Sequence, residues 1–237
     1  MNETIFVLPF AGGSSRSFSA WKDISSFQLV YIDMPGKGTR ENELLLHHFS
    51  EMVDEGFAQI VDYLNSHKIA DYCILGHSMG SYIAYQITKK MIKEKVKAPK
   101  CLFMSGSVPP QFAEYQRIES IINDECLFLQ YIVEFGLVTQ KIAESHFFQK
   151  RYLPQIKSDY EAMLEYRDNG DALDIPKVVF LNGKQDDLVN GHVEEWTKYF
   201  VKTPNYIWYE GSHFFVLECV QTIFEDIAVI LKESEEK

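Results

Sequence analysis

The sequence predicts a doubly wound α/β fold around a mostly parallel sheet. Short apolar runs rich in β-branched residues recur along the chain, which is typical of strands buried on both faces. They span residues 5–9, 29–34, 72–75, 101–104, 178–181 and 206–209. Segments with helical spacing of apolar residues lie between them, at 49–64, 81–96, 193–200 and 222–231. Such alternation of strands and helices favours helices on both faces of a parallel sheet.

A helical excursion interrupts this alternation. Between Ser107 and Asp174 no clear strand pattern occurs, and helical pieces rich in Phe, Tyr, Ile and Leu occupy 118–135 and 141–152. The length of 237 residues fits one α/β domain. We therefore expect a single domain over 1–237, with a helical lid insertion at about 107–174.

Charge and composition narrow the choice of partners and location. The chain has 34 Asp and Glu against 23 Lys and Arg, a net charge of −11, which disfavours nucleic acid as a partner. No apolar run approaches the length of a membrane span, and the first residues lack the pattern of a signal peptide. Cys73 and Cys101 lie in apolar runs and are expected to be buried free thiols. We expect a cytoplasmic protein that does not bind membranes.

The strongest local signal is the motif GHSMG at 76–80, which follows a predicted strand and precedes a predicted helix. This is the setting of a nucleophile elbow, a tight turn that projects a serine hydroxyl above the sheet. Side chains at Gly76 and Gly80 would collide with the backbone of such a turn. Ser78 is therefore the predicted nucleophile, and a chance glycine turn is the alternative.

A serine nucleophile needs a base, and the base needs an acid that orients it. Asp186 follows the predicted strand at 178–181, and His213 follows the strand at 206–209. Because the carboxyl ends of parallel strands meet at one edge of the sheet, these loops can converge on Ser78. We therefore expect Asp186 to orient His213 as the base, with the adjacent Asp187 as the alternative acid.

The other histidines are not predicted to act in catalysis. His77 lies inside the elbow, but its side chain should point away from Ser78 and take a packing or hydrogen-bonding role. His192 is expected on the following helix, facing solvent. The other four histidines do not follow a predicted strand and are expected at the surface. They are His47, His48, His67 and His146.

An oxyanion hole requires two backbone N–H groups aimed at the carbonyl oxygen. Met79, directly after the nucleophile, is expected to supply one. The loop PFAGGS at 9–14, after the first predicted strand, is expected to supply the other through Ala11. A glycine-rich turn without function is the alternative for that loop.

Taken together, the motifs resemble those of type II thioesterases, the free-standing editing enzymes of polyketide and nonribosomal peptide synthesis. The resemblance covers nearly the whole chain, in order. Its motifs are LPFAGGS at 8–14 with Trp21, MPGKGTR at 34–40, GHSMG at 76–80, SGS at 105–107, LPQIKSDY at 153–160 with Tyr166, the segment 183–196, and GSHFF at 211–215.

The chain departs from the family pattern at four positions outside the predicted triad. The family usually has Arg where Lys37 and Lys157 stand, His where Gln111 stands and Pro where Asp187 stands. These departures concern lid contacts and acyl preference.

The resemblance implies an α/β-hydrolase that cleaves the thioester between an acyl group and the phosphopantetheine arm of a carrier protein. Its partners would be acyl or peptidyl carrier proteins of a polyketide or nonribosomal peptide synthetase. No metal or organic cofactor is required, because the phosphopantetheine belongs to the substrate. We expect a monomer.

The lid is expected to form an apolar chamber for the acyl group, with packing of the lid onto the body as the alternative role for each residue. The candidates are Phe135, Leu137, Phe147, Phe148 and Tyr152. Because carrier proteins are generally acidic, docking would need a local basic patch, and Lys150, Arg151 and Lys157 are its expected contributors.

Two other functions compete with this interpretation. A small-molecule carboxylesterase would share the fold and the triad and differ in the leaving group. A catalytically silent carrier-binding module would not need to retain Ser78, Asp186 and His213 together.

Overall fold

A computed structural model describes residues 3–23, 26–113, 115–168 and 170–235. In these residues one six-stranded sheet has the order β2-β1-β3-β4-β5-β6, and all neighbouring strands are parallel. The strands are β1 Thr4–Leu8, β2 Gln28–Tyr31, β3 Tyr72–His77, β4 Cys101–Ser105, β5 Val178–Gly183 and β6 Asn205–Tyr209. Each falls on one of the apolar runs identified in the sequence.

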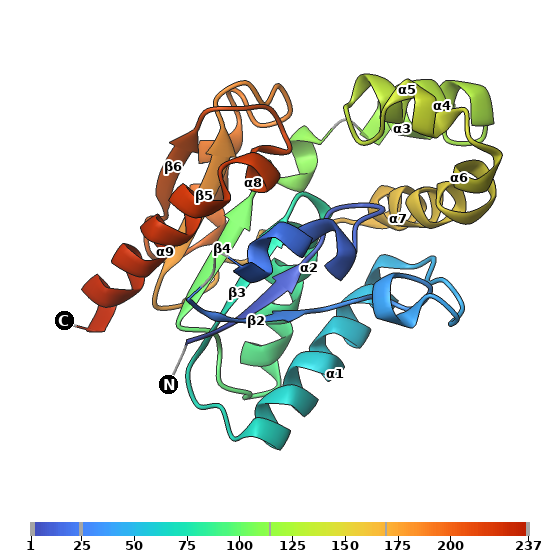
Figure 1. The fold of residues 1–237 in the computed structure, drawn as a ribbon. Helices are drawn as coiled ribbons and strands as arrows, with labels where there is room; N and C mark the ends of the chain where they lie inside the picture. Colours follow the sequence, from blue (N-terminus) through green and yellow to red (C-terminus); the bar gives the residue numbers. More distant parts are fainter. Residues whose placement is uncertain (1–2, 24–25, 114, 169, 236–237) are drawn as a thin grey trace.

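Helices cover both faces of the sheet. Helices α1 (Phe49–His67) and α2 (Met79–Lys93) lie on one face, and α9 (Val220–Glu235) lies on the other with the short α8 (Phe215–Glu218) (Figure 1). The 3₁₀ segments η1 (Ser15–Asp23) and η2 (Gly38–Arg40) follow β1 and β2. The predicted doubly wound α/β sheet is therefore confirmed.

Two apolar cores follow from the alternation of side chains along the strands. In β1, Phe6 and Leu8 pack into the core on the α1 and α2 side, whereas Ile5 and Val7 pack into the core on the α9 side. The central strands β1, β3, β4 and β5 are buried along their whole length, and the edge strands β2 and β6 are partly exposed. The sheet is thus a rigid base for the loops at its carboxyl edge.

The predicted lid segment is helical but more broken than expected. It contains η3 (Pro110–Phe112), α3 (Tyr115–Ile121), α4 (Glu125–Glu134), α5 (Gln140–Ala143), α6 (His146–Arg151) and α7 (Leu153–Glu165). The predicted helix at 118–135 is split at Asp124, whose carboxylate accepts hydrogen bonds from the backbone N–H groups of Cys126 and Leu127 and so starts a new helix.

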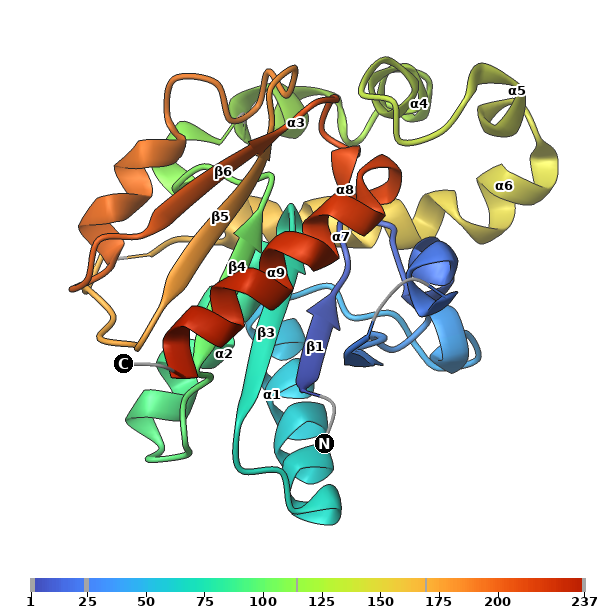
Figure 2. The ribbon, with the colours of Figure 1, turned by 60° about the vertical axis from the view of Figure 1, so that its left-hand side comes forward.

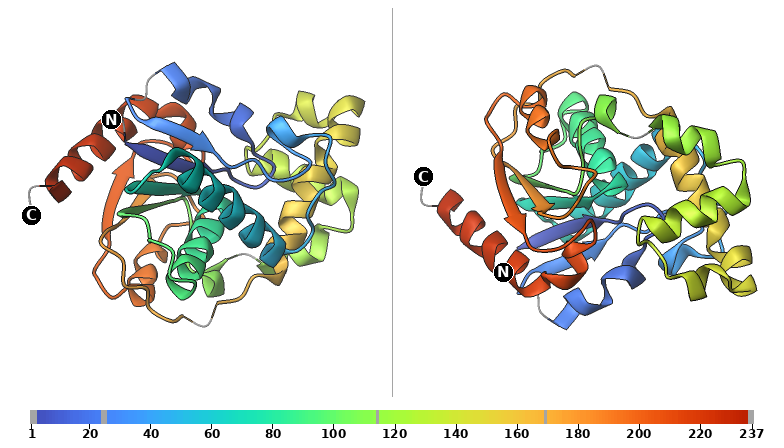
Figure 3. Two further views of the ribbon diagram at one scale, coloured as in Figure 1. Left: turned by 90° about the horizontal axis from the view of Figure 1, so that it is seen from below. Right: turned by 90° about the horizontal axis from the view of Figure 1, so that it is seen from above.

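We call residues 110–165 the helical insertion. It lies to one side of the sheet, beyond the ends to which the strand arrows point (Figures 2 and 3). The predicted helix at 193–200 forms as the 3₁₀ helix η4 (Val193–Tyr199), held by the fully buried Trp196. None of the helices in the described ranges combines the length and the apolar composition that a membrane span requires.

Glycines allow a close approach of backbone segments at the turn from β3 to α2. A Cβ atom added to Gly76 would lie 2.2 Å from the carbonyl oxygen of Gly80. A Cβ atom added to Gly80 would lie 2.1 Å from the carbonyl oxygen of Leu8 at the end of β1. Both neighbours are backbone and cannot move aside independently. The two glycines therefore bring the start of α2 against the end of β1.

We predict that Gly80→Ala lowers the free energy of unfolding by about 3 kcal/mol or more, because the added methyl group would overlap the Leu8 carbonyl. Urea unfolding measures this change. Gly136→Ala is the matched control, since nothing lies within 4 Å of its Cβ position. Its positive φ of 81° leaves a cost of about 1–2 kcal/mol. Equal destabilisation by the two variants would contradict the packing argument.

Candidate active site

Ser78 stands at the turn between β3 and α2 in a backbone conformation that a residue with a side chain rarely adopts. Its φ is +55° and its ψ is −119°. The backbone N–H of Ser78 donates to Ser105 O at 2.7 Å, and Ser81 Oγ links Gly76 O at 2.8 Å to Ser105 N at 2.9 Å. These bonds fasten the turn to β4. Ser78 is partly exposed, whereas the residues on either side of it are buried.

His213 and Asp186 form a buried pair beside this turn. Nδ1 of His213 lies 2.8 Å from Oδ2 of Asp186, and both side chains are less than 5% exposed. Nε2 of His213 is buried and has no hydrogen-bond partner among the described residues, Ser78 included. In enzymes without substrate the bond from nucleophile to base is often long and tightens in the complex. The free Nε2 is therefore the atom that can take a proton.

The loops that carry the pair are joined to each other. Gln185 N donates to Gly211 O at 3.0 Å, and Gly211 N donates to the Gln185 side chain at 2.5 Å. A Cβ atom on Gly183 would lie 2.5 Å from Ser212 O, so the loops are in direct contact. This contact presents Asp186 to His213. The adjacent Asp187 is exposed and makes no such bond with His213.

His77 supports the pair from below. Its Nδ1 lies 2.9 Å from Ser105 Oγ, and its ring centroid lies 4.8 Å from that of His213. Burial lowers the pKa of His77 well below its ordinary value, and the nearby His213 lowers it further. The ring is therefore neutral and does not repel a proton gained by His213. As expected from the sequence, His77 has a packing and hydrogen-bonding role.

Two backbone N–H groups remain open beside Ser78. Met79 N is the first N–H of α2, and Ala11 N lies in the loop after β1; neither has a hydrogen-bond partner among the described residues. In the same loop, Gly12 N donates to Asp159 and Gly13 N donates to Phe10 O at 2.8 Å. Ala11 therefore offers the N–H that the turn does not use itself.

Asp159 of α7 fixes this loop from the helical insertion. Its Oδ2 accepts the hydrogen bond from Gly12 N at 2.6 Å, and its Oδ1 forms an ion pair with Lys37. Both charged side chains are buried. Gly12 also packs against Ile156, one turn earlier on α7, and its positive φ of 77° suits a glycine. A buried carboxylate therefore sets the position of the loop that carries Ala11.

A cavity of about 340 Å³ opens from Ser78 into the helical insertion, within the size range of ligand pockets. Most of its lining is aromatic or aliphatic. The lining residues are Ala11, Ser78, Tyr82, Gly106, Ser107, Val108, Phe112, Ala113, Tyr115, Ile118, Tyr131, Phe135, Tyr160, Met163, Asp187, Leu188, Asn190 and His192. We call this space the serine cavity.

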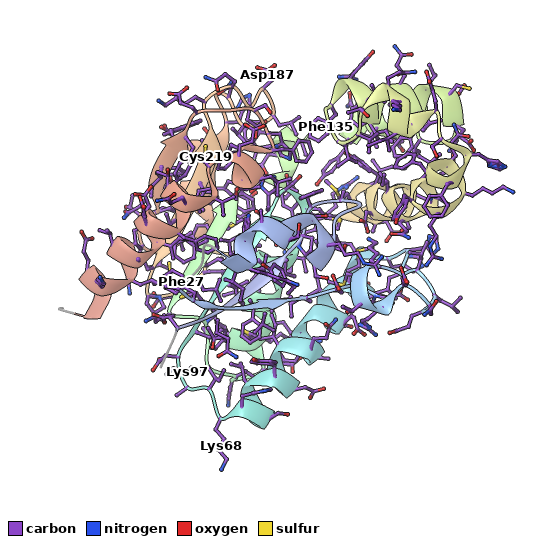
Figure 4. All side chains as sticks on the ribbon, viewed as in Figure 1. Phe27, Lys68, Lys97, Phe135, Asp187 and Cys219 are labelled. Carbon is purple, nitrogen blue, oxygen red and sulfur yellow. The ribbon has the colours of Figure 1, made fainter. Side chains whose placement is uncertain are left out.

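A second cavity of about 350 Å³ leads to His213 and Ser212. It shares Tyr131, Phe135, Asp187 and Leu188 with the serine cavity, so the two spaces adjoin at these residues. Figure 4 shows Phe135 on the side of the helical insertion and Asp187 on the side of the sheet. The ring of Phe135 lies 4.8 Å from that of His213, between centroids. Ser78 therefore lies in the lining of one cavity and His213 in the lining of the adjoining one.

The structure separates the five residues expected to line an acyl chamber. Phe135 lines both cavities, but the other four are not part of the lining of either. Leu137 is half-buried between the two cores, and Phe148 is buried and stacks on Tyr152. Phe147 is 68% exposed. Phe147 and Phe148 belong to α6 and Tyr152 follows it, whereas Leu137 precedes α5. The positions of these four residues fit the alternative role in the packing and surface of the insertion.

The remaining histidines and cysteines lie mostly as expected. His47 and His48 are exposed beside Glu161 and Glu165. His192, expected to face solvent, is exposed but also stacks on Phe112 at the serine cavity, with ring centroids 4.4 Å apart. Cys73 and Cys101 are buried free thiols. Across the described ranges no three His, Cys, Asp or Glu side chains form a cluster suited to a metal ion.

Sequence reasoning missed the contribution of α7. Ile156, Asp159, Tyr160 and Met163 all face the active site, either at the loop after β1 or in the serine cavity. Their spacing of three and four residues is the signal of one helix face and could have grouped them. The partner of Asp159 could not be found this way, because Lys37 is 122 residues away in the sequence.

The parallel sheet and the serine at the turn from β3 to α2 are those of the α/β-hydrolase fold. Within that fold the chain belongs to the Thioesterase domain family, whose model matches residues 3–231.

The similarity to individual relatives covers most of both chains. The chain is 29% identical to the probable anguibactin biosynthesis thioesterase AngT of Vibrio anguillarum, over 98% of this chain and 93% of that protein. It is 25% identical to the human medium-chain S-acyl fatty acid synthase thioesterase, over 90% and 81% of the two chains. The crystal structure of ClbQ from the colibactin NRPS/PKS pathway has the same fold, with a TM-score of 0.88, 24% identity and 99% of each chain covered.

The adjacent aspartates provide a matched test of the acid. We predict that Asp186→Asn lowers kcat by roughly 10⁴-fold, because the amide would no longer hold the tautomer of His213 that leaves Nε2 free to accept a proton. Asp187→Asn should retain kcat within about threefold, since that side chain does not contact His213. Steady-state thioester hydrolysis measures both. If Asp187→Asn lost more activity than Asp186→Asn, the acid would be Asp187 and the assignment to Asp186 would be wrong.

The Lys37–Asp159 pair gives a test of the clamp on the loop after β1. We predict that Asp159→Ala lowers the free energy of unfolding by about 3–5 kcal/mol, because it leaves the Lys37 charge buried without a partner. The double variant Lys37→Met/Asp159→Ala should be more stable than Asp159→Ala. Urea unfolding distinguishes them, and a double variant less stable than the single one would refute the buried pair.

Proposed function

We propose that this protein hydrolyses thioesters between acyl groups and the phosphopantetheine arm of carrier proteins in nonribosomal peptide or polyketide biosynthesis. Its role would be the removal of stalled acyl groups or the release of a product. The observation that carries the proposal is the buried Asp186–His213 pair beside the open Ser78 turn. Membership of the Thioesterase domain family supports the thioester as substrate. The names of AngT and ClbQ support the kind of pathway.

Acylation would begin with His213. With Nδ1–H donated to Asp186, Nε2 takes the proton of Ser78 Oγ as the oxygen attacks the thioester carbonyl. The carbonyl oxygen becomes negative and accepts hydrogen bonds from the N–H groups of Ala11 and Met79. The C–S bond then breaks. The pantetheine sulfur leaves with the proton from His213, and the acyl group stays on Ser78 as an ester.

Deacylation would repeat these steps with water. His213 Nε2 takes a proton from a water molecule, whose oxygen attacks the ester carbonyl. The same two N–H groups stabilise the oxyanion. Ser78 Oγ leaves with the proton from His213, and the free acid departs. The sequence of steps uses no metal ion and no organic cofactor.

The cavities suggest how the substrate would lie. The acyl group would occupy the serine cavity, whose lining is mostly apolar, and the pantetheine arm would reach Ser78 past Phe135 and Asp187. Lys150 and Arg151 end α6 and are exposed, as a docking patch requires. Arg151 is already bonded to Glu41, so Lys150 would be the freer contributor to carrier docking.

The carboxylesterase remains the second candidate function, because the same triad would cleave oxygen esters. The two differ in the leaving group. A thiol has a pKa of about 8.5 and leaves readily, so a thioesterase needs less help from a protonated His213 than an esterase does. The silent carrier-binding module is disfavoured by the retained pairing of Asp186 with His213.

We predict that the protein cleaves an acetyl-carrier protein faster than an oxygen ester of the same acyl group, and that Ser78→Ala abolishes the cleavage. Release of free thiol and of acid measures the two rates. We expect Ser78→Ala to stay folded, and its circular dichroism spectrum, compared with that of the wild type, checks this.

Two results would contradict the proposal. Faster cleavage of the oxygen ester would favour the carboxylesterase. Carrier binding without cleavage of either substrate by the wild-type protein would favour the silent module.

A further inference from the structure

Two residues that line the serine cavity, Ser107 and Tyr115, have side-chain hydroxyl groups without a hydrogen-bond partner among the described residues. Ser107 Oγ and Tyr115 Oη are both inaccessible to solvent, and neither is bonded to any described residue. Both residues line the cavity. Ser107 itself is only 3% exposed. Buried hydroxyl groups are normally paired, so these two indicate a ligand that pairs with them.

The neighbouring residues show that this feature is specific. Tyr82 lines the same cavity, but its hydroxyl donates to Val108 O at 2.9 Å. The backbone oxygen of Ser107 likewise accepts a hydrogen bond from Trp196 Nε1 at 3.1 Å. The open hydrogen-bonding capacity therefore belongs to the side chains of Ser107 and Tyr115.

The two residues come from different parts of the fold. Ser107 follows β4, next to Gly106, whose Cβ position would lie 3.1 Å from Cε1 of His213. Tyr115 begins α3 in the helical insertion. One hydroxyl is therefore near the reacting groups on the body, and the other is on the insertion that covers them.

An unbranched alkyl chain would fit this cavity badly in one respect. It would leave the hydroxyls of Ser107 and Tyr115 buried without partners, and an unpaired buried hydroxyl is costly in free energy. A site built to hydrogen-bond a substrate hydroxyl rejects the analogue that lacks it. An acyl group with a hydroxyl substituent would offer these two groups the partner that they lack.

We propose that the serine cavity selects acyl groups that carry a hydroxyl or another uncharged hydrogen-bonding substituent over alkyl groups of equal length. This inference rests on the proposed thioesterase function and specifies its substrate class. An uncharged substituent is favoured because, among the described lining residues, the acidic and basic side chains are those of Asp187 and His192, and both are exposed. An ammonium group further inside would lose its hydration without a counter-charge.

The test uses pairs of pantetheine thioesters. Each pair consists of a straight-chain acyl group and the same acyl group with one hydroxyl, and the position of the hydroxyl differs from pair to pair. For at least one position we expect kcat/KM of the wild type to favour the hydroxyacyl substrate about tenfold or more. Ser107→Ala and Tyr115→Phe should each reduce this ratio severalfold. They should do so by slowing the hydroxyacyl substrate while leaving or raising the rate on the alkyl substrate.

Opposite responses of the two substrates distinguish selectivity from general damage to the fold, which would slow both. Tyr82→Phe is the matched control, because it removes a cavity hydroxyl that is already bonded within the protein. Its ratio should stay near that of the wild type. A wild type that treats all pairs alike, or variants that slow both substrates equally, would overturn the inference.

A second measurement separates this inference from the proposed function. Calorimetry on Ser78→Ala with pantetheine thioethers, which cannot be hydrolysed, compares the same pairs by affinity. Ser78-dependent hydrolysis without discrimination would retain the proposed function and reject the selectivity. Tighter binding of the hydroxylated thioether, together with no hydrolysis by the wild type, would retain the selectivity and reject the proposed function.

Discussion

The backbone of Ser78, at a φ of +55°, costs free energy, and the packing that maintains it places the other reactive groups. Gly76 and Gly80 let β3, α2 and the end of β1 approach to backbone contact. The same contact brings the N–H of Met79 and the loop with Ala11 to one side of the serine hydroxyl. β4 holds the turn from the other side through Ser105, so the turn that carries the proposed nucleophile is fixed to two strands of the sheet. Helix α7 holds the loop that carries Ala11.

Helix α7 joins this loop to the space for the acyl group. Asp159 binds the loop after β1, while Tyr160 and Met163 on the same helix line the serine cavity. A buried ion pair such as Lys37–Asp159 contributes little net stability, but it strongly disfavours arrangements that separate its charges. An acyl group packed against Tyr160 would therefore press on the helix that positions Ala11. Under the proposed mechanism, substrate fit and oxyanion stabilisation would be coupled through α7.

The sheet and the placement of Ser78, Asp186 and His213 could be predicted, because buried parallel strands and the turns after them leave local sequence signals. Asp186 could be favoured over Asp187 from spacing, but the hydrogen bond to His213 required the structure. The cavity was harder to predict. Aromatic residues in the insertion have similar patterns whether they line a cavity or pack outside it, as Phe135 and Phe148 do. Contacts such as Lys37 with Asp159 join distant segments and leave no local pattern.

The central claim is that His213 activates Ser78 as the nucleophile. Labelling with a fluorophosphonate, followed by mass spectrometry of the peptides, tests it most directly. The account predicts a covalent adduct on Ser78 in the wild type and much slower labelling of Ser78 in a His213→Ala variant that is still folded. An adduct on another residue, or equal labelling rates with and without His213, would contradict it.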